Sequence, residues 1–177
     1  MPLTPFHYPV AYVVYRLDKR LVLPGLIVGS MFPDLEIPIM VLFFGNRIPD
    51  HLVLRSLLGA TTIGTILSVL LTFLIYPTLV SSLFRIEKNK VERRCRLSLT
   101  LILSAFLGNV SHVLLDVTTH ESNPIFWPFL NDVPSPVVPA LGGLQNASLT
   151  MHVLMAVLFL VFLIYKRENI VEGLLVE

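Results

Sequence analysis

The sequence predicts an all-α protein: a polytopic bundle of about four membrane-spanning helices, one of them broken, plus a short N-terminal helix. Hydrophobic residues make up 54% of the 177 residues, charged residues only 14%, and the mean hydropathy is +0.76. Soluble domains carry about 25% charged residues, so this composition excludes an ordinary water-soluble fold. The net charge of +1 creates no field that would hold a polyanion, and we expect no nucleic-acid partner. Residues 1–177 are expected to form a single integral membrane domain.

Three stretches are predicted to cross the membrane as continuous helices. Residues 56–84 contain no charged side chain, and residues 97–115 contain one ionisable side chain, His112. Residues 148–165 are strongly apolar after His152 and are followed by two basic residues. Because the hydrocarbon core takes about 20 mostly apolar residues per helix, each stretch is long enough to span it.

A fourth crossing is predicted over residues 21–46, but as a broken helix. This apolar segment is interrupted by prolines and acids, namely Pro24, Pro33, Asp34, Glu36 and Pro38. Irregular backbone at membrane depth persists only where protein or a watery cavity satisfies its polar groups. The aromatic segment 5–15 is about half the spanning length, so we expect a short N-terminal helix packed on the others.

Basic residues predict the orientation, because short cytoplasmic loops are enriched in Lys and Arg. The linker 85–96 carries six of the thirteen basic residues and is predicted to be cytoplasmic. Threading outward from it places eleven of the thirteen on the same side and gathers most histidines in the outer half. We therefore expect a multi-pass protein of the cell membrane whose site faces the outer side.

The Pro-rich segment 120–147 follows the span 97–115. It holds five prolines and the only tryptophan, Trp127, a residue that favours the membrane interface. We expect an extracytoplasmic cap loop.

Polar residues around the end of span 97–115 share one helix face. Asn109, His112, Asp116 and His120 recur at steps of three or four residues. A carboxylate inside a membrane helix costs about 2.5–3.5 kcal/mol on insertion scales, and such residues usually pair, line cavities or act in function. The i, i+4 spacing of His112 and Asp116 lets both side chains ligate one metal ion. It equally allows a structural hydrogen bond between them, and both interpretations stay open.

Two acids lie beside the break in segment 21–46. Asp34, which follows Pro33, either caps a new helix or ligates a metal. Two carboxylates in an apolar segment need a cation or protons nearby. We take Asp34 as a candidate metal ligand and Glu36 as a candidate catalytic base.

His51 and Arg55 lie one turn apart at the start of span 56–84. His51 is a candidate metal ligand, and the neighbouring Asp50 is a second candidate base. The guanidinium of Arg55 either extends to the membrane interface or binds a phosphate group beside a metal.

Four stretches of the chain, taken together, resemble the motifs of the small prokaryotic membrane-bound metal-dependent hydrolases, a group named largely by prediction. In chain order they read MPLTPFH at 1–7, GSMFPDLE at 29–36, LGNVSHVLLDVT at 107–118 and PIFWPF at 124–129. Carried over residue by residue, the resemblance implies a site made of His7, Asp34, His112 and Asp116.

The chain departs from this family in the segment before span 56–84. The family has a stretch with two histidines there, whereas this chain reads PDHLVLRS at 49–56. Either His51 substitutes, or Asp50 and Arg55 occupy the histidine positions. His and Asp arrays on helical bundles also look like the zinc-dependent phospholipase C group, which is an analogy of fold.

The leading interpretation is a membrane-embedded hydrolase that holds a divalent metal ion. His and carboxylate ligands fit zinc, which we therefore expect, or another divalent ion. A metal-activated water would attack a lipid-borne phosphoester, and membrane lipids would be its partners. The alternative is a non-enzymatic small membrane protein, such as a carrier, an ion-binding subunit or a scaffold, in which the polar stripe joins helices.

Overall fold

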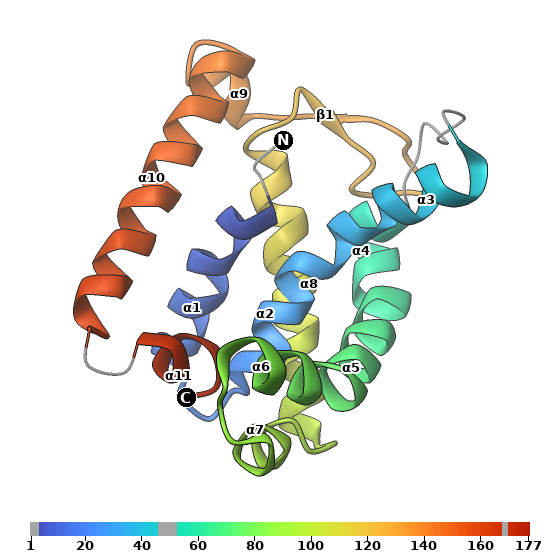
Figure 1. Ribbon diagram of the computed structural model, residues 1–177. Helices are drawn as coiled ribbons and strands as arrows, with labels where there is room; N and C mark the ends of the chain where they lie inside the picture. The colour runs from blue at the N-terminus through green and yellow to red at the C-terminus, as the bar shows by residue number, and fades with distance from the viewer. Residues whose placement is uncertain (1–3, 46–52, 168–169) are drawn as a thin grey trace.

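The computed structural model describes residues 4–45, 53–167 and 170–177 and shows an α-helical bundle (Figure 1). In this part of the chain, four helices are long and apolar enough to span a membrane: Leu23–Phe43, Leu57–Leu74, Leu99–Val117 and Leu144–Tyr165. The prediction of an all-α, membrane-spanning bundle is confirmed.

The N-terminal helix and the broken span form as expected. A 3₁₀ turn, η1 (Thr4–His7), leads into α1 (Tyr8–Leu17). The broken span consists of α2 (Leu23–Met31), the 3₁₀ turn η2 (Phe32–Leu35) and α3 (Glu36–Phe44). Pro33 lies in the break, whereas Pro24 begins α2 and does not interrupt it, because a proline N–H would be unpaired in the first turn anyway.

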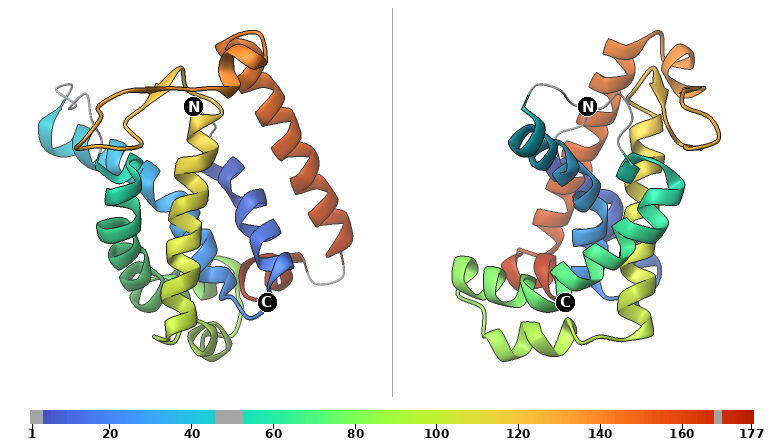
Figure 2. Two further views of the ribbon diagram at one scale, coloured as in Figure 1. Left: turned by 180° about the vertical axis from the view of Figure 1, so that it is seen from behind. Right: turned by 90° about the vertical axis from the view of Figure 1, so that its right-hand side faces the viewer.

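The prediction of one continuous helix over residues 56–84 is wrong. After η3 (Val53–Arg55), the helical run of α4 (Leu57–Gly59), the π-helical η4 (Ala60–Gly64) and α5 (Thr65–Leu74) ends at Leu74, and the chain then turns into a separate helix, α6 (Tyr76–Phe84). Pro77 ends the span, because proline lacks an N–H and its ring clashes with the carbonyl four residues earlier. The Tyr76 hydroxyl then donates a 2.8 Å hydrogen bond to the Leu175 carbonyl, which holds α6 against the C-terminal segment (Figure 2).

Two predicted connecting segments contain helical structure. The basic linker 85–96 includes α7 (Lys88–Arg94). The segment 120–147 holds a two-stranded antiparallel pair, β1 (Ser122–Asn123) and β2 (Val133–Pro134), followed by α9 (Val137–Ala140). Its predicted end is too late, because α10 (Leu144–Tyr165) begins directly after Gly143, whose φ of 106° makes the turn.

The two ends of the bundle are formed by different elements. One end holds α6, α7, α11 (Ile170–Leu175) and the carboxyl end of α1, and the opposite end holds β1 and α9 (Figure 1). Ion pairs of Lys90 with Glu172 and of Lys166 with Glu177 join the segments of the first end. The basic segments predicted to share one side of the membrane therefore lie together.

The centre of the bundle is a close contact between α2 and α8 (Leu99–Val117). A Cβ atom on Gly29 would lie 2.4 Å from the Ala105 carbonyl oxygen, and one on Gly108 would lie 2.6 Å from the Leu26 carbonyl oxygen. Only glycine permits this approach, as small residues do at many membrane helix contacts. The contact brings the end of α2 onto the polar face of α8.

Candidate metal centre

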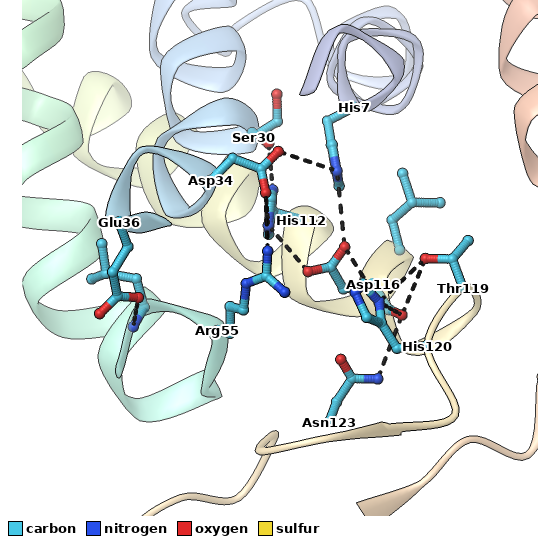
Figure 3. A network of polar contacts seen from close by, with 12 residues as sticks. His7, Ser30, Asp34, Glu36, Arg55, His112, Asp116, Thr119, His120 and Asn123 are labelled. Carbon is cyan, nitrogen blue, oxygen red and sulfur yellow. Dashed lines mark hydrogen bonds and ion pairs between the residues drawn. The ribbon is translucent and has the colours of Figure 1, made fainter. Parts of the chain in front are cut away.

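Polar side chains from four separate elements meet in the upper half of the bundle (Figure 3). His7 comes from η1, Asp34 from η2, Arg55 from η3, and His112 and Asp116 from α8. The two histidines and Asp116 are at most 2% exposed. We call these five residues the His–Asp cluster.

The distances within the His–Asp cluster suit ligands that share one ion. His112 Nε2 lies 3.4 Å from an Asp116 carboxylate oxygen and 3.6 Å from an Asp34 oxygen. His7 Nε2 lies 3.9 Å from an oxygen of each aspartate. Tetrahedral ligands with bonds of about 2.0–2.2 Å lie roughly 3.3–3.6 Å apart. Ligand atoms of His7, His112 and Asp116, one from each, lie within 4.8 Å of one another, which is slightly wider than a closed zinc site, and Asp34 contacts both histidines beside them.

Several ligand atoms in this cluster are buried without a hydrogen bond. Within the described residues, this holds for Nε2 of His7, Nε2 of His112 and both carboxylate oxygens of Asp116. Buried polar atoms are nearly always hydrogen-bonded, and exceptions call for an explanation such as a bound ion. The 3.4 Å separation of His112 Nε2 from the nearest Asp116 oxygen is longer than the about 2.7–2.9 Å of a charge-assisted hydrogen bond. An ion between them would also satisfy Nε2 of His7, which favours the metal interpretation of their spacing.

A hydrogen bond orients His112 for metal binding. Its Nδ1 lies 2.8 Å from the Ser30 carbonyl oxygen and, with a carbonyl as partner, acts as the donor. In the neutral ring the lone pair is then on Nε2, which faces the two aspartates. Metal-ligating histidines are typically fixed in this way through their second nitrogen, and here the α2–α8 contact supplies the carbonyl.

His7 packs directly on His112. The two rings are stacked, with centroids 4.1 Å apart and an angle of 16° between their planes. Burial, and next the neighbouring His112, lower the pKa of His7 to about 3. The imidazole is therefore neutral near pH 7, the form in which a ring nitrogen can ligate a metal.

The charges in the cluster leave room for a cation. Arg55 Nη2 lies 3.5 Å from an Asp34 oxygen. When both histidines are neutral, as metal ligands are, this guanidinium supplies one positive charge beside the two carboxylates of Asp34 and Asp116. A net negative charge at low dielectric is costly unless a cation compensates it. The donor set of imidazole and carboxylate groups matches zinc and related divalent ions.

Glu36 lies outside the His–Asp cluster and holds a backbone turn in place. Its two carboxylate oxygens accept hydrogen bonds from the backbone N–H groups of Val53 (3.0 Å) and Leu54 (2.9 Å). These bonds fix η3, the turn that carries Arg55. The geometry thus assigns Glu36 to positioning Arg55, whereas the sequence suggested a catalytic base. The capping interpretation of Asp34 is not supported either, since α3 shows no side-chain cap.

The structure unites five of the predicted site residues, namely His7, Asp34, Arg55, His112 and Asp116. The other candidates, Asp50 and His51, lie outside the described residues, and their roles stay predictions.

His120 was on the predicted polar face but was not chosen as a site residue. Its Nδ1 lies 2.9 Å from the Asp116 carbonyl oxygen and 3.9 Å from an Asp116 carboxylate oxygen. The i, i+4 step after Asp116 was the signal that could have found it.

Residues 1–173 match the family described as "Domain of unknown function (DUF4184)". The match covers nearly the whole chain, so the protein belongs to this family. No curated protein and no solved structure matches the chain.

Proposed function

We propose that this protein is a membrane-embedded, metal-dependent hydrolase. Its divalent ion is held by His7, Asp34, His112 and Asp116, and this set of imidazole and carboxylate ligands favours zinc. One observation carries the proposal: buried nitrogen atoms of His7 and His112 and a carboxylate oxygen of Asp116, from two distant segments, all lie within 4.8 Å of one another, and carboxylate oxygens of Asp34 lie 3.6–3.9 Å from both histidines. The resemblance to the small membrane-bound metal-dependent hydrolases supports the same conclusion.

The chemistry follows from the ligands and from Arg55. A bound divalent ion would lower the pKa of a ligated water and polarise the scissile bond. Arg55, held by Asp34 and by the Glu36-fixed turn, presents a planar guanidinium suited to a phosphoryl group. A phosphoester carried by a membrane lipid is therefore the proposed substrate.

We further propose that the protein lies in the cell membrane with the linker 85–96 in the cytoplasm and the cluster toward the outer side. The enrichment of basic residues at cytoplasmic ends supports this orientation. In the bundle, α7 lies at the end opposite β1 and α9 (Figure 1).

Metal analysis tests the proposal most directly. Protein purified in mild detergent should retain close to one divalent ion per chain, measured by inductively coupled plasma mass spectrometry. Asp116→Asn preserves shape but removes the charge, and His112→Ala removes the ligand atom, so both should lose the ion. Asn109→Ala is the matched control, because Asn109 is equally buried on α8 and bonds to Ser68 and Ala105.

Hydrolysis then separates the enzyme from its alternative. A metal-loaded protein should hydrolyse a phospholipid or a model phosphodiester, and Asp116→Asn should not. Wild-type protein that takes up no zinc, manganese or nickel would overturn the metal site. Stoichiometric metal without turnover of either substrate would favour the non-enzymatic, ion-binding alternative.

A further inference from the structure

An apolar groove runs along the bundle between α1 and α10. It has a volume of about 630 Å³, within the range of about 300–1,000 Å³ typical of small-molecule sites. Its lining is almost wholly apolar and includes Phe6, Pro9, Met31, Phe159, Leu163 and Leu174. At one end α11 closes it, where the Tyr8 hydroxyl donates a 2.8 Å hydrogen bond to the Leu174 carbonyl.

The groove exists because α10 stands apart from the rest of the bundle. Only two residues of this helix are buried, Ala147 and Met155. Its contacts with α1 include the aromatic pairs Tyr8–Phe159 and Tyr12–Phe162. In Figure 1, α10 lies to one side of α1 at the margin of the bundle. A groove with such an apolar lining suits hydrocarbon chains.

A second groove of about 680 Å³ lies beside the carboxyl end of α8 and is lined by both polar and apolar residues. Its polar residues include His120, Glu121, Gln145, Ser148 and His152. His120 connects this groove to the His–Asp cluster through Asp116, to which it is bonded.

The two grooves are neighbours. Phe6 lines the apolar groove and His152 the second one, and their rings are in edge-to-face contact, with centroids 5.0 Å apart. His7 directly follows Phe6 in the chain, so a cluster residue lies next to a residue at this contact.

We infer that the substrate is a phospholipid whose acyl chain lies in the α1–α10 groove and whose headgroup lies in the groove of His120, Ser148 and His152. This inference rests on the proposed function and specifies its substrate class. The cluster adjoins the apolar groove through Phe6, which precedes His7, and the second groove through His120, which contacts Asp116. This suits a phospholipid, whose phosphoester lies between its acyl chains and its headgroup. The apolar groove is open to hydrocarbon at its side, since Leu160 in its lining is 56% exposed.

The test fills the apolar groove without touching the cluster. Ala156 lines the groove, and Ala156→Trp should block it. The matched control is Val157→Trp at the adjacent, 51% exposed position, which is not among the residues that line the groove. Metal content should equal that of wild type in both variants.

The readout compares two substrates that differ in chain length. Ala156→Trp should lower the rate on a long-chain phospholipid at least tenfold and leave that on a short, water-soluble phosphodiester unchanged. Val157→Trp should leave both rates unchanged. An equal effect of Ala156→Trp on the two substrates, or no effect on either, would overturn the inference.

A binding measurement distinguishes failure of this inference from failure of the proposed function. A phospholipid with a photoreactive acyl chain should label the α1–α10 groove saturably in wild type, and Ala156→Trp should abolish the saturable part. Saturable labelling without any hydrolysis would refute the enzyme and keep the lipid site. Hydrolysis with only unsaturable labelling would keep the enzyme and refute the lipid site.

Discussion

The contact between α2 and α8 provides a sharp test of how the bundle builds its metal centre. In Gly108→Ala, the new Cβ would lie 2.6 Å from the Leu26 carbonyl oxygen and 2.9 Å from the Ser30 nitrogen, whereas ordinary contacts begin at 3.4 Å. Both neighbours are backbone atoms, so α2 must move by about 0.8 Å. The Ser30 carbonyl belongs to this helix and moves with it.

The shift should act on metal affinity through His112. A displacement of that size lengthens the 2.8 Å contact between His112 Nδ1 and the Ser30 oxygen to about 3.6 Å, which is no longer a hydrogen bond. Loss of such an orienting bond typically costs 10–100-fold in metal affinity, or about 1.4–2.7 kcal/mol. Stability should change less, because overpacking costs about 1–3 kcal/mol while Ala gains about 1 kcal/mol over Gly in helix propensity.

The assay is competitive titration of the bound ion with a chelator. Gly25→Ala is the matched control in the same helix contact, since its Cβ would lie nearest to Leu101 Cδ1 at 2.9 Å, a side-chain terminus that can rotate away. We expect wild-type affinity in the control and at least a tenfold loss in Gly108→Ala. Equal affinities in the two variants would show that the backbone contact does not orient His112.

Four further outcomes are expected. Arg55→Lys keeps the charge but removes the planar fork, so phosphodiester hydrolysis should fall at least tenfold, about 1.4 kcal/mol of transition-state stabilisation, with metal content unchanged; equal rates would remove this residue from the site. Glu36→Gln replaces one acceptor oxygen by a donor, so it should cost about 1–3 kcal/mol of stability and lower hydrolysis while the metal is retained; unchanged denaturant unfolding would contradict the two hydrogen bonds of this carboxylate. A reporter fused at Asn89 should be cytoplasmic and one at Ser135 extracytoplasmic, and the opposite pattern would reverse the proposed orientation. The Cys95 thiol is 1% exposed and burial raises its pKa to about 12, so its thiolate is scarce below that pH; maleimide labelling at pH 7 should be slow until the protein is unfolded, and rapid labelling of the native protein would contradict its burial.

The sequence by itself determined the class of protein and part of the site. Apolar length and the scarcity of charge are properties of each segment alone, so the four spans could be predicted without a partner helix. The break at Pro33 follows from the missing N–H of proline, and the shared face of His112 and Asp116 follows from helical periodicity. These features depend on neighbours within a few residues.

Only the tertiary structure decided which polar groups meet and what each one does. Three contacts join segments far apart in the chain: His7 stacks on His112, His112 Nδ1 donates to the Ser30 carbonyl, and Glu36 accepts hydrogen bonds from two backbone N–H groups. From the sequence alone, a carboxylate in an apolar segment that ligates a metal cannot be distinguished from one that fixes a turn. The difference lies in which backbone lies within about 3 Å of it, and that is set by the close approach of whole helices at positions such as Gly108.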